Sequence, residues 1–202
     1  MDFQVDANTH SPVLLFHYPS NESTEFEYLR RFVKMEFGSL TDQKPVGTHA
    51  IQPWVADEFP KQLEDFHCEA VVLELERTFW EKATILHAEH YRDAAKPMPD
   101  RFSRHYSDVA ALARHATADR ALADNKLRQR VTDWKRRFFA ATWARYDLAI
   151  PGTFRLLPPG SRLGELERDY RAMRDMFLVD PPPFESLLES LRGLENRINR
   201  MP

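Results

Sequence analysis

Residues 78–92 read TFWEKATILHAEHYR, and this stretch decides the fold of the larger part of the chain. Its apolar residues recur every three to four positions, which is the period of a helix that buries one face. The residues on and beside this face are Phe79, Trp80, Ala83, Thr84, Leu86, His87 and His90. Because Pro97 and Pro99 cannot continue a helix, we expect it to run from about residue 77 to about residue 95.

The same helical period continues to the C-terminus. It predicts further helices at residues 101–115, 119–139, 162–178 and 184–199. Residues 141–161, which contain three prolines and two glycines, are expected to be irregular. The apolar stripes of the last two helices suit either a dimer face or the protein's own core, and amphipathic helices usually bury their stripe within their own domain.

Residues ahead of the first helix follow a different pattern. Short apolar or alternating runs at residues 12–18, 32–37 and 70–75 predict three β-strands. Residues 44–60, with three prolines, predict a loop that contains a short helix. Alternation in the second strand places Glu36 on one face and apolar side chains on the other. Strands followed by helices indicate an α+β protein, and three short strands make an incomplete sheet.

The composition limits the class of protein. The chain has 202 residues, of which 43% are hydrophobic and 29% charged, as in an ordinary soluble domain. No apolar run is long enough to span a membrane, the polar N-terminus is no secretory signal, and one cysteine cannot form an internal disulfide. We therefore expect a cytoplasmic protein without a membrane partner. Only 6 glycines are present, which argues against a glycine-rich phosphate loop.

Charge is distributed unevenly along the chain. Residues 101–137 hold ten Lys and Arg against four Asp and Glu, whereas residues 1–100 are acidic and residues 138–202 are neutral. A basic segment in an acidic protein indicates an anionic partner such as a nucleotide or nucleic acid. A solvated helix face that happens to be basic explains the same numbers.

Well-known catalytic patterns are absent from the sequence, which has no P-loop, no HExxH, no GxSxG and no paired-cysteine zinc pattern. His87 and His90 lie one helical turn apart, as in some metal sites, but zinc sites use three or four ligands. Cys68 follows His67, an arrangement that suits an activated thiol, but a lone cysteine is usually a small buried hydrophobe.

The most promising group is formed by Lys82, Asp108 and Glu36. If the first two predicted helices form an antiparallel hairpin, Lys82 and Asp108 face one cleft. An ammonium and two carboxylates are the residue types that phosphoryl-transfer sites use to neutralise phosphate charge and to bind divalent metal. The simpler interpretation is a surface ion pair between Lys82 and Glu81 or Glu89.

These stretches also carry a resemblance. TFWEKATILHAEHYR, together with RFSRHYSDVAAL at residues 101–112, resembles the nucleotidyltransferases of the AbiEii/AbiGii toxin family. Further matches are VKMEFG, HAIQPWVADEFP and, with less specific motifs, the C-terminal LERDYRAMRDMF and FESLLESLRGLENRIN. The resemblance covers about residues 12–199. It implies a nucleotidyltransferase-like fold and transfer of a nucleotide from an NTP, with Mg²⁺, to an RNA (such as tRNA) or protein acceptor. It also implies a toxin of a toxin–antitoxin or phage-defence system, with an antitoxin partner.

The resemblance assigns a role to each matching residue. Lys82 would contact the NTP phosphates, and Asp108 would orient the site or act as a base. Arg104 and His105, which flank Asp108, would bind phosphate or shape the pocket. Glu36 resembles the third, metal-binding carboxylate on the core strand of this fold. The implied catalytic residues are therefore Lys82, Asp108 and Glu36.

One departure from the family concerns its Gly-Ser loop and Asp-x-Asp pair, which hold the triphosphate and the metals. Gly38-Ser39 is followed by Leu40-Thr41-Asp42 and lacks the paired aspartates. We therefore expect residues 1–75 to be the remainder of a truncated α+β core and residues 76–202 to be a helical region. A single metal-binding carboxylate does not make the two-metal site that catalysis by this chain alone requires. The alternative function is a non-catalytic protein that binds RNA, nucleotide or a partner.

Overall fold

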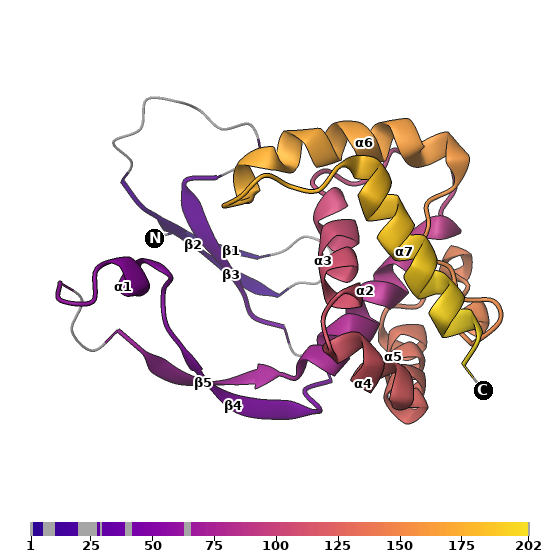
Figure 1. The fold of residues 1–202 in the computed structure, drawn as a ribbon, viewed down its shortest axis with the longest axis horizontal. Helices are drawn as coiled ribbons and strands as arrows, with labels where there is room; N and C mark the ends of the chain where they lie inside the picture. Colours follow the sequence, from indigo (N-terminus) through magenta and orange to yellow (C-terminus); the bar gives the residue numbers. More distant parts are fainter. Residues whose placement is uncertain are drawn as a thin grey trace.

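The computed structural model describes the chain at residues 2–5, 11–19, 28, 30–38, 42–62 and 66–201. Within these residues the strands and a single-turn helix, α1 (Val55–Glu58), come first, and the longer helices follow. Figure 1 shows the strands on one side of the molecule and the helices on the other. The architecture is α+β, as the order of the sequence patterns predicts.

The described strands form two antiparallel sheets. β1 (Asp2–Val5), β2 (Pro12–His17) and β3 (Phe32–Glu36) lie side by side in that order. β4 (Val46–Ile51) pairs with β5 (Cys68–Leu73) to form the second sheet. The chain leaves β5 and enters the helical part directly.

The helical part is built around α2 (Leu75–His90). Three helices contact it: α3 (Ser103–Ala113), α4 (Thr117–Ala123) and α5 (Asn125–Phe138). Two more, α6 (Leu163–Ala172) and α7 (Phe184–Asn199), pack against α3. Short 3₁₀ turns lie at residues 142–144, 146–148, 160–162 and 173–176. None of the helices in the described ranges combines the length and hydropathy that crossing a membrane requires.

The hydrophobic core lies in this helical part. On α2, Phe79, Trp80, Ala83 and Leu86 are fully buried, as the helical stripe predicts. The last two helices add their own stripes to the same core: Leu166, Tyr170, Leu187, Leu191, Leu194 and Ile198. The interpretation of those stripes as a dimer face is therefore wrong, and the interpretation as core is confirmed.

The prediction of a loop at residues 44–60 is wrong in its first half. β4 occupies Val46–Ile51, between Pro45 and Pro53. Proline is disfavoured inside a strand because it cannot donate to the ladder, but these prolines flank the strand and do not interrupt it. The predicted short helix is present as α1. The sequence does not predict β1. Its four residues are too few for the alternation of a strand to be distinguished from an irregular polar N-terminus.

The prediction of one helix over residues 119–139 is also wrong, because the chain forms α4 and α5 there. Asp124 separates them, and its side chain accepts a 2.9 Å hydrogen bond from the Leu127 backbone N–H. An aspartate in this position caps the N-terminus of the following helix. The helix predicted for residues 162–178 is also shorter than expected. α6 ends at Ala172, and the chain forms a 3₁₀ turn at residues 173–176.

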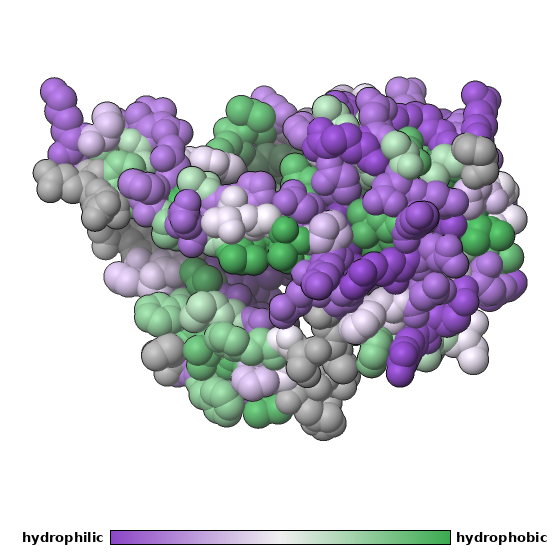
Figure 2. All heavy atoms as spheres, turned by 90° about the horizontal axis from the view of Figure 1, so that it is seen from below, coloured by the Kyte–Doolittle hydropathy of each residue, from purple (hydrophilic) through white to green (hydrophobic). Residues whose placement is uncertain are grey.

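The sheet of β1, β2 and β3 has two unlike faces. The register places Lys34 and Glu36 on the face that also carries the buried Val13 and Leu15. The opposite face is apolar and largely exposed, and its members are Phe3, Val5, Leu14, Phe16, Val33 and Met35. Figure 2 shows hydrophobic residues gathered on the strand side of the molecule, whereas the helical side is mainly hydrophilic in that view.

Candidate functional site

Lys82 and Asp108 meet where α2 packs against α3. The Lys82 ammonium donates a 2.8 Å hydrogen bond to Oδ2 of Asp108 and lies 3.2 Å from Nδ1 of His105. The alternative pairing of Lys82 with Glu81 or Glu89 is wrong. Glu81 instead accepts hydrogen bonds from Arg77, and Glu89 is buried beside arginines.

His105 is a neutral acceptor in this group. Burial lowers the pKa of His105 to about 4, and the positive charges of Lys82 and Arg104 contribute to the same decrease. The imidazole is therefore uncharged at neutral pH, and Nδ1 accepts from the Lys82 ammonium while Nε2 carries the proton. Arg104 itself is exposed on the surface of α3. The structure thus brings three of the five predicted site residues into contact, namely Lys82, His105 and Asp108.

Lys135 of α5 is a further cation that the sequence patterns did not single out. It lies three and four residues after the buried Thr132 and Val131, so it shares the face of α5 that packs toward α2. Burial lowers the pKa of the Lys135 ammonium, and the charges of Arg77 and Lys82 act in the same direction. The sequence pattern that could have pointed to Lys135 is its spacing from Val131 and Thr132, which places a lysine on the apolar face of a basic amphipathic helix.

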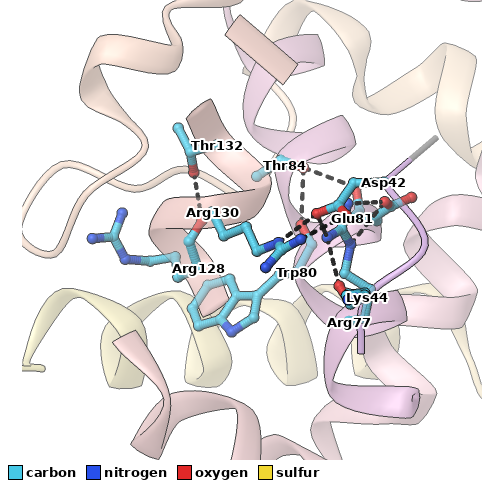
Figure 3. A network of polar contacts seen from close by, with 9 residues as sticks. All are labelled: Asp42, Lys44, Arg77, Trp80, Glu81, Thr84, Arg128, Arg130 and Thr132. Atoms are coloured by element: carbon cyan, nitrogen blue, oxygen red, sulfur yellow. Dashed lines mark hydrogen bonds and ion pairs between the residues drawn. The ribbon is translucent and has the colours of Figure 1, made fainter. Parts of the chain in front are cut away.

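An ionic network with Asp42 and Arg77 buried at its centre connects the segment before β4 to α2 and α5, and Figure 3 shows its side chains converging on Asp42. Arg77 donates to Asp42 at 2.7 Å, and Arg130 donates to both oxygens of Asp42, at 2.6 and 2.9 Å. Arg77 also donates to Glu81 at 2.8 and 3.0 Å and to the Lys44 carbonyl at 2.9 Å. Because Glu81 precedes Lys82, this network fixes the part of α2 that presents the Lys82 ammonium.

Charge pairing sets the ionisation state of Asp42. Hydrogen bonds from Arg130 lower the pKa of Asp42 to about 2, with a further contribution from Arg77, and together they outweigh the effect of burial. Asp42 is therefore a carboxylate at all physiological pH values. Asp42 directly follows Ser39, Leu40 and Thr41. These three residues belong to the stretch that was compared with the Gly-Ser loop of the family, and they lie outside the described residues.

Among the contacts of the described residues, none joins Glu36 to Lys82, His105 or Asp108. Glu36 is exposed on β3, and its carboxylate accepts a 2.6 Å hydrogen bond from Lys34 of the same strand. Within the described ranges, no three His, Cys, Asp or Glu side chains are close enough to hold a metal ion. The described residues therefore do not assemble the Mg²⁺ site that the resemblance implies for Glu36.

The two histidines of α2 have structural roles. Nε2 of the buried His87 donates to the Arg145 carbonyl at 2.9 Å, and its Nδ1 accepts from the Arg155 backbone N–H at 3.1 Å. His90 bonds the Leu157 carbonyl at 2.7 Å. Both side chains thus anchor the irregular segment after α5 to α2, and the interpretation of the pair as a metal site is wrong. Cys68 is exposed on β5, so the expectation of a buried small hydrophobe is also wrong.

Comparison with known proteins extends over most of the chain. Residues 2–190 match the family model described as "Nucleotidyl transferase AbiEii toxin, Type IV TA system". The match includes α2, α3 and α5, and with them the whole group around Lys82. Neither the curated proteins nor the solved structures gave a match.

Proposed function

Because the chain belongs to the AbiEii family of nucleotidyl transferase toxins of type IV toxin–antitoxin systems, we propose that the Lys82 group binds the triphosphate of an NTP for nucleotide transfer. The observation that carries this proposal is the contact of the Lys82 ammonium with both Asp108 and His105. A cognate antitoxin and a cytoplasmic location are part of the proposal, because toxins of this family belong to toxin–antitoxin pairs.

The contacts of Lys82 leave it able to bind a phosphate. An ammonium has three N–H donors, and Asp108 and His105 accept from two of them, so that within the described part of the chain one donor is left for a phosphate oxygen. The side chain is 26% exposed, so its charge is less screened than that of a fully solvated lysine. Asp108 and His105 hold the ammonium in place before the ligand arrives, which reduces the cost of ordering a flexible side chain.

The proposed reaction is the attack of an acceptor hydroxyl oxygen on the α-phosphorus of the NTP. A new P–O bond forms to the acceptor, the bond to the β-phosphate oxygen breaks, and pyrophosphate leaves. Lys82 stabilises the negative charge that develops on the leaving phosphates. The hydroxyl proton passes to a carboxylate base, for which Asp108 is the candidate because it is half-exposed and within reach of the same site.

RNA is the acceptor that the surface of α5 favours. Trp134 and Phe138 lie with ring centroids 4.3 Å apart, and the Arg137 guanidinium lies over Phe138 at 5.4 Å. Toward the start of the same helix, Lys126 and Arg130 help to line a hollow of about 550 Å³. Basic side chains interleaved with aromatic rings bind single-stranded nucleic acid through phosphate contacts and base stacking.

Lys82→Ala is expected to reduce nucleotide transfer about 10- to 100-fold, the amount that a lost charge-assisted hydrogen bond accounts for. The measurement is incorporation of each labelled NTP into total tRNA in the presence of Mg²⁺. Lys96→Ala, which removes an exposed lysine outside the group, serves as the control and is expected to keep wild-type activity. Equal transfer by the Lys82→Ala and wild-type proteins would refute the role of Lys82. RNA binding by a wild-type protein that transfers nothing would assign the alternative, non-catalytic function.

Binding of single-stranded RNA is expected to weaken steeply with salt. Each phosphate contact contributes about 0.7 to the slope of log K against log salt concentration. The double variant Lys126→Ala/Arg137→Ala is therefore expected to reduce that slope by about 1.4. Fluorescence anisotropy with a labelled oligonucleotide between about 50 and about 300 mM salt, the range where such contacts are measured, gives the slope. A slope that is the same in both proteins would exclude α5 as the RNA surface.

A further inference from the structure

One face of the sheet of β1, β2 and β3 is apolar and lies open to solvent. Phe3, Phe16 and Val33 on this face are 66%, 50% and 55% exposed. We call it the outer face, and its members are the residues that alternation turns away from the buried side of the sheet: Phe3, Val5, Leu14, Phe16, Val33, Met35 and Phe37. Contiguous exposed apolar patches of this kind mark interaction surfaces on soluble proteins.

The inner face of the same sheet is already buried within the chain. Val13 and Leu15, which project to that side, are 2% and 9% exposed. Lys34 and Glu36 lie on the same side and pair with each other. Antiparallel sheets that face water on one side carry polar residues there, whereas the outer face of this sheet is apolar. The outer face therefore needs a further layer, and the described residues leave it about half open.

The outer face carries no charged side chain in the described strands. Alternation places Asp2, Lys34 and Glu36 on the inner side. Two copies that meet through their outer faces therefore bring no like charges together, whereas a charged partner finds no opposite charge to pair with. A two-fold interface uses the same patch on both subunits and needs a surface that is complementary to itself. An uncharged apolar sheet face meets this condition, so the charge pattern favours a second copy of this chain as the occupant.

The exposed area of the outer face is enough for a weak dimer. An aromatic side chain carries about 150–250 Å² of surface, and Phe3, Phe16 and Phe37 are each at least half exposed, so these three rings leave about 300 Å² open. The aliphatic members add to this and bring the outer face to roughly 500 Å² per copy. A dimer therefore buries about 1,000 Å² in total, near the lower end for specific protein interfaces.

We propose that two copies of this chain associate through their outer faces and form a two-fold dimer in which one sheet packs on the other. In such packing the two sheets lie about 10 Å apart, with their strands within about 30° of each other. Phe16, on the central strand β2 and opposite Val33, contributes a half-exposed ring to the interface. Because the buried area is small, the dissociation constant is expected in the micromolar range. The inference does not depend on the proposed function.

Sedimentation velocity of the full chain between about 1 and about 200 μM tests the proposal, because this range brackets the dissociation constants of small interfaces. The wild type is expected to shift from monomer to dimer. Phe16→Glu is expected to weaken association at least about tenfold, since it buries a carboxylate in an apolar interface. Gln4→Glu, the matched control, adds the same charge at an exposed position on the inner side of the sheet and is expected to dimerise within about twofold of the wild type. A reducing agent is present throughout, because the exposed Cys68 can link two chains through a disulfide that does not involve the outer face.

Three outcomes would overturn the inference: a wild type that stays monomeric at the highest concentration, a Phe16→Glu protein that dimerises as the wild type does, and an equal loss of association in Phe16→Glu and Gln4→Glu. Binding of a monomeric wild type to lipid vesicles or to another protein, lost in Phe16→Glu, would assign the outer face to a different occupant and also overturn it. Melting temperatures at the lowest concentration show whether each variant is folded. If Phe16→Glu is not, Phe3→Glu repeats the test at a more exposed position of the edge strand β1, where packing within one chain is least affected.

Discussion

Replacing Trp80 with alanine is expected to lower the free energy of unfolding by about 3–5 kcal/mol, as large-to-small changes of buried aromatic residues do. Trp80 is 0% exposed, and its ring meets Phe79 at 5.0 Å and Phe154 at 5.9 Å, both edge to face. Its indole N–H also donates to the Ala121 carbonyl at 3.0 Å. Alanine leaves a cavity between α2 and its neighbours and leaves that carbonyl without its donor.

The measurement is urea unfolding followed by far-ultraviolet circular dichroism, since a tryptophan is being removed. Trp54→Ala is the matched control, because Trp54 is 73% exposed, and its effect is expected to be within about 0.5 kcal/mol. Trp80→Phe keeps an aromatic ring and loses the hydrogen bond, so it is expected to fall between the two. A Trp80→Ala protein as stable as the Trp54→Ala protein would show that α2 is not the centre of the core.

The helices were predictable from the sequence where a strict apolar period ends at prolines. α7 is the clearest case, because the prediction of residues 184–199 agrees with its bounds, Phe184–Asn199. The break between α4 and α5 was missed because the apolar stripe continues through it, and only the capping side chain of Asp124 marks the interruption. Local patterns therefore found the buried faces, whereas one side-chain hydrogen bond decided where a helix begins.

The site was predictable only where its residues fall in one local motif. Arg104, His105 and Asp108 are close together on α3 and could be paired with Lys82 because the next helix folds back on α2. Asp42 reaches α2 and α5 from a distant segment, and nothing in the sequence pairs Asp42 with Arg130, 88 residues away. Such contacts depend on how the helices pack against one another, which periodicity does not specify.

Glu36 shows what strand alternation specifies and what it leaves open. Alternation correctly separates the face of β3 that carries Glu36 from the apolar face. It does not specify which of the two faces packs against the rest of the protein, or which residues pack against Glu36. The carboxylate pairs with Lys34, two residues away on the same face. The metal-binding role of Glu36 rests on its residue type and on the resemblance and stays a prediction, and Lys34 is the partner that the described residues give it.

Asp42→Asn is expected to lower the free energy of unfolding at pH 7 by about 2–3 kcal/mol, the value of a carboxyl pKa lowered from 3.8 to about 2. The substitution keeps the size of the side chain and removes the charge that Arg77 and Arg130 share. Arg77 retains Glu81 and the Lys44 carbonyl as acceptors, so the variant is expected to fold. Asp133→Asn, which affects an exposed ion pair of α5, is the control and is expected to change stability by less than about 0.5 kcal/mol.

The pH dependence separates the charge of Asp42 from its packing. The folded-state pKa of Asp42, about 2, lies below its ordinary value of 3.8, so the unfolded chain binds the proton more readily than the folded one. The stability that Asp42 contributes is therefore fully present above about pH 4 and is lost as the pH falls toward 2. Urea unfolding at steps between pH 7 and pH 2 should show the gap between wild type and Asp42→Asn closing in that window. A gap of constant size would mean that asparagine disturbs the packing between α2 and α5, and that the ionic network contributes nothing of its own.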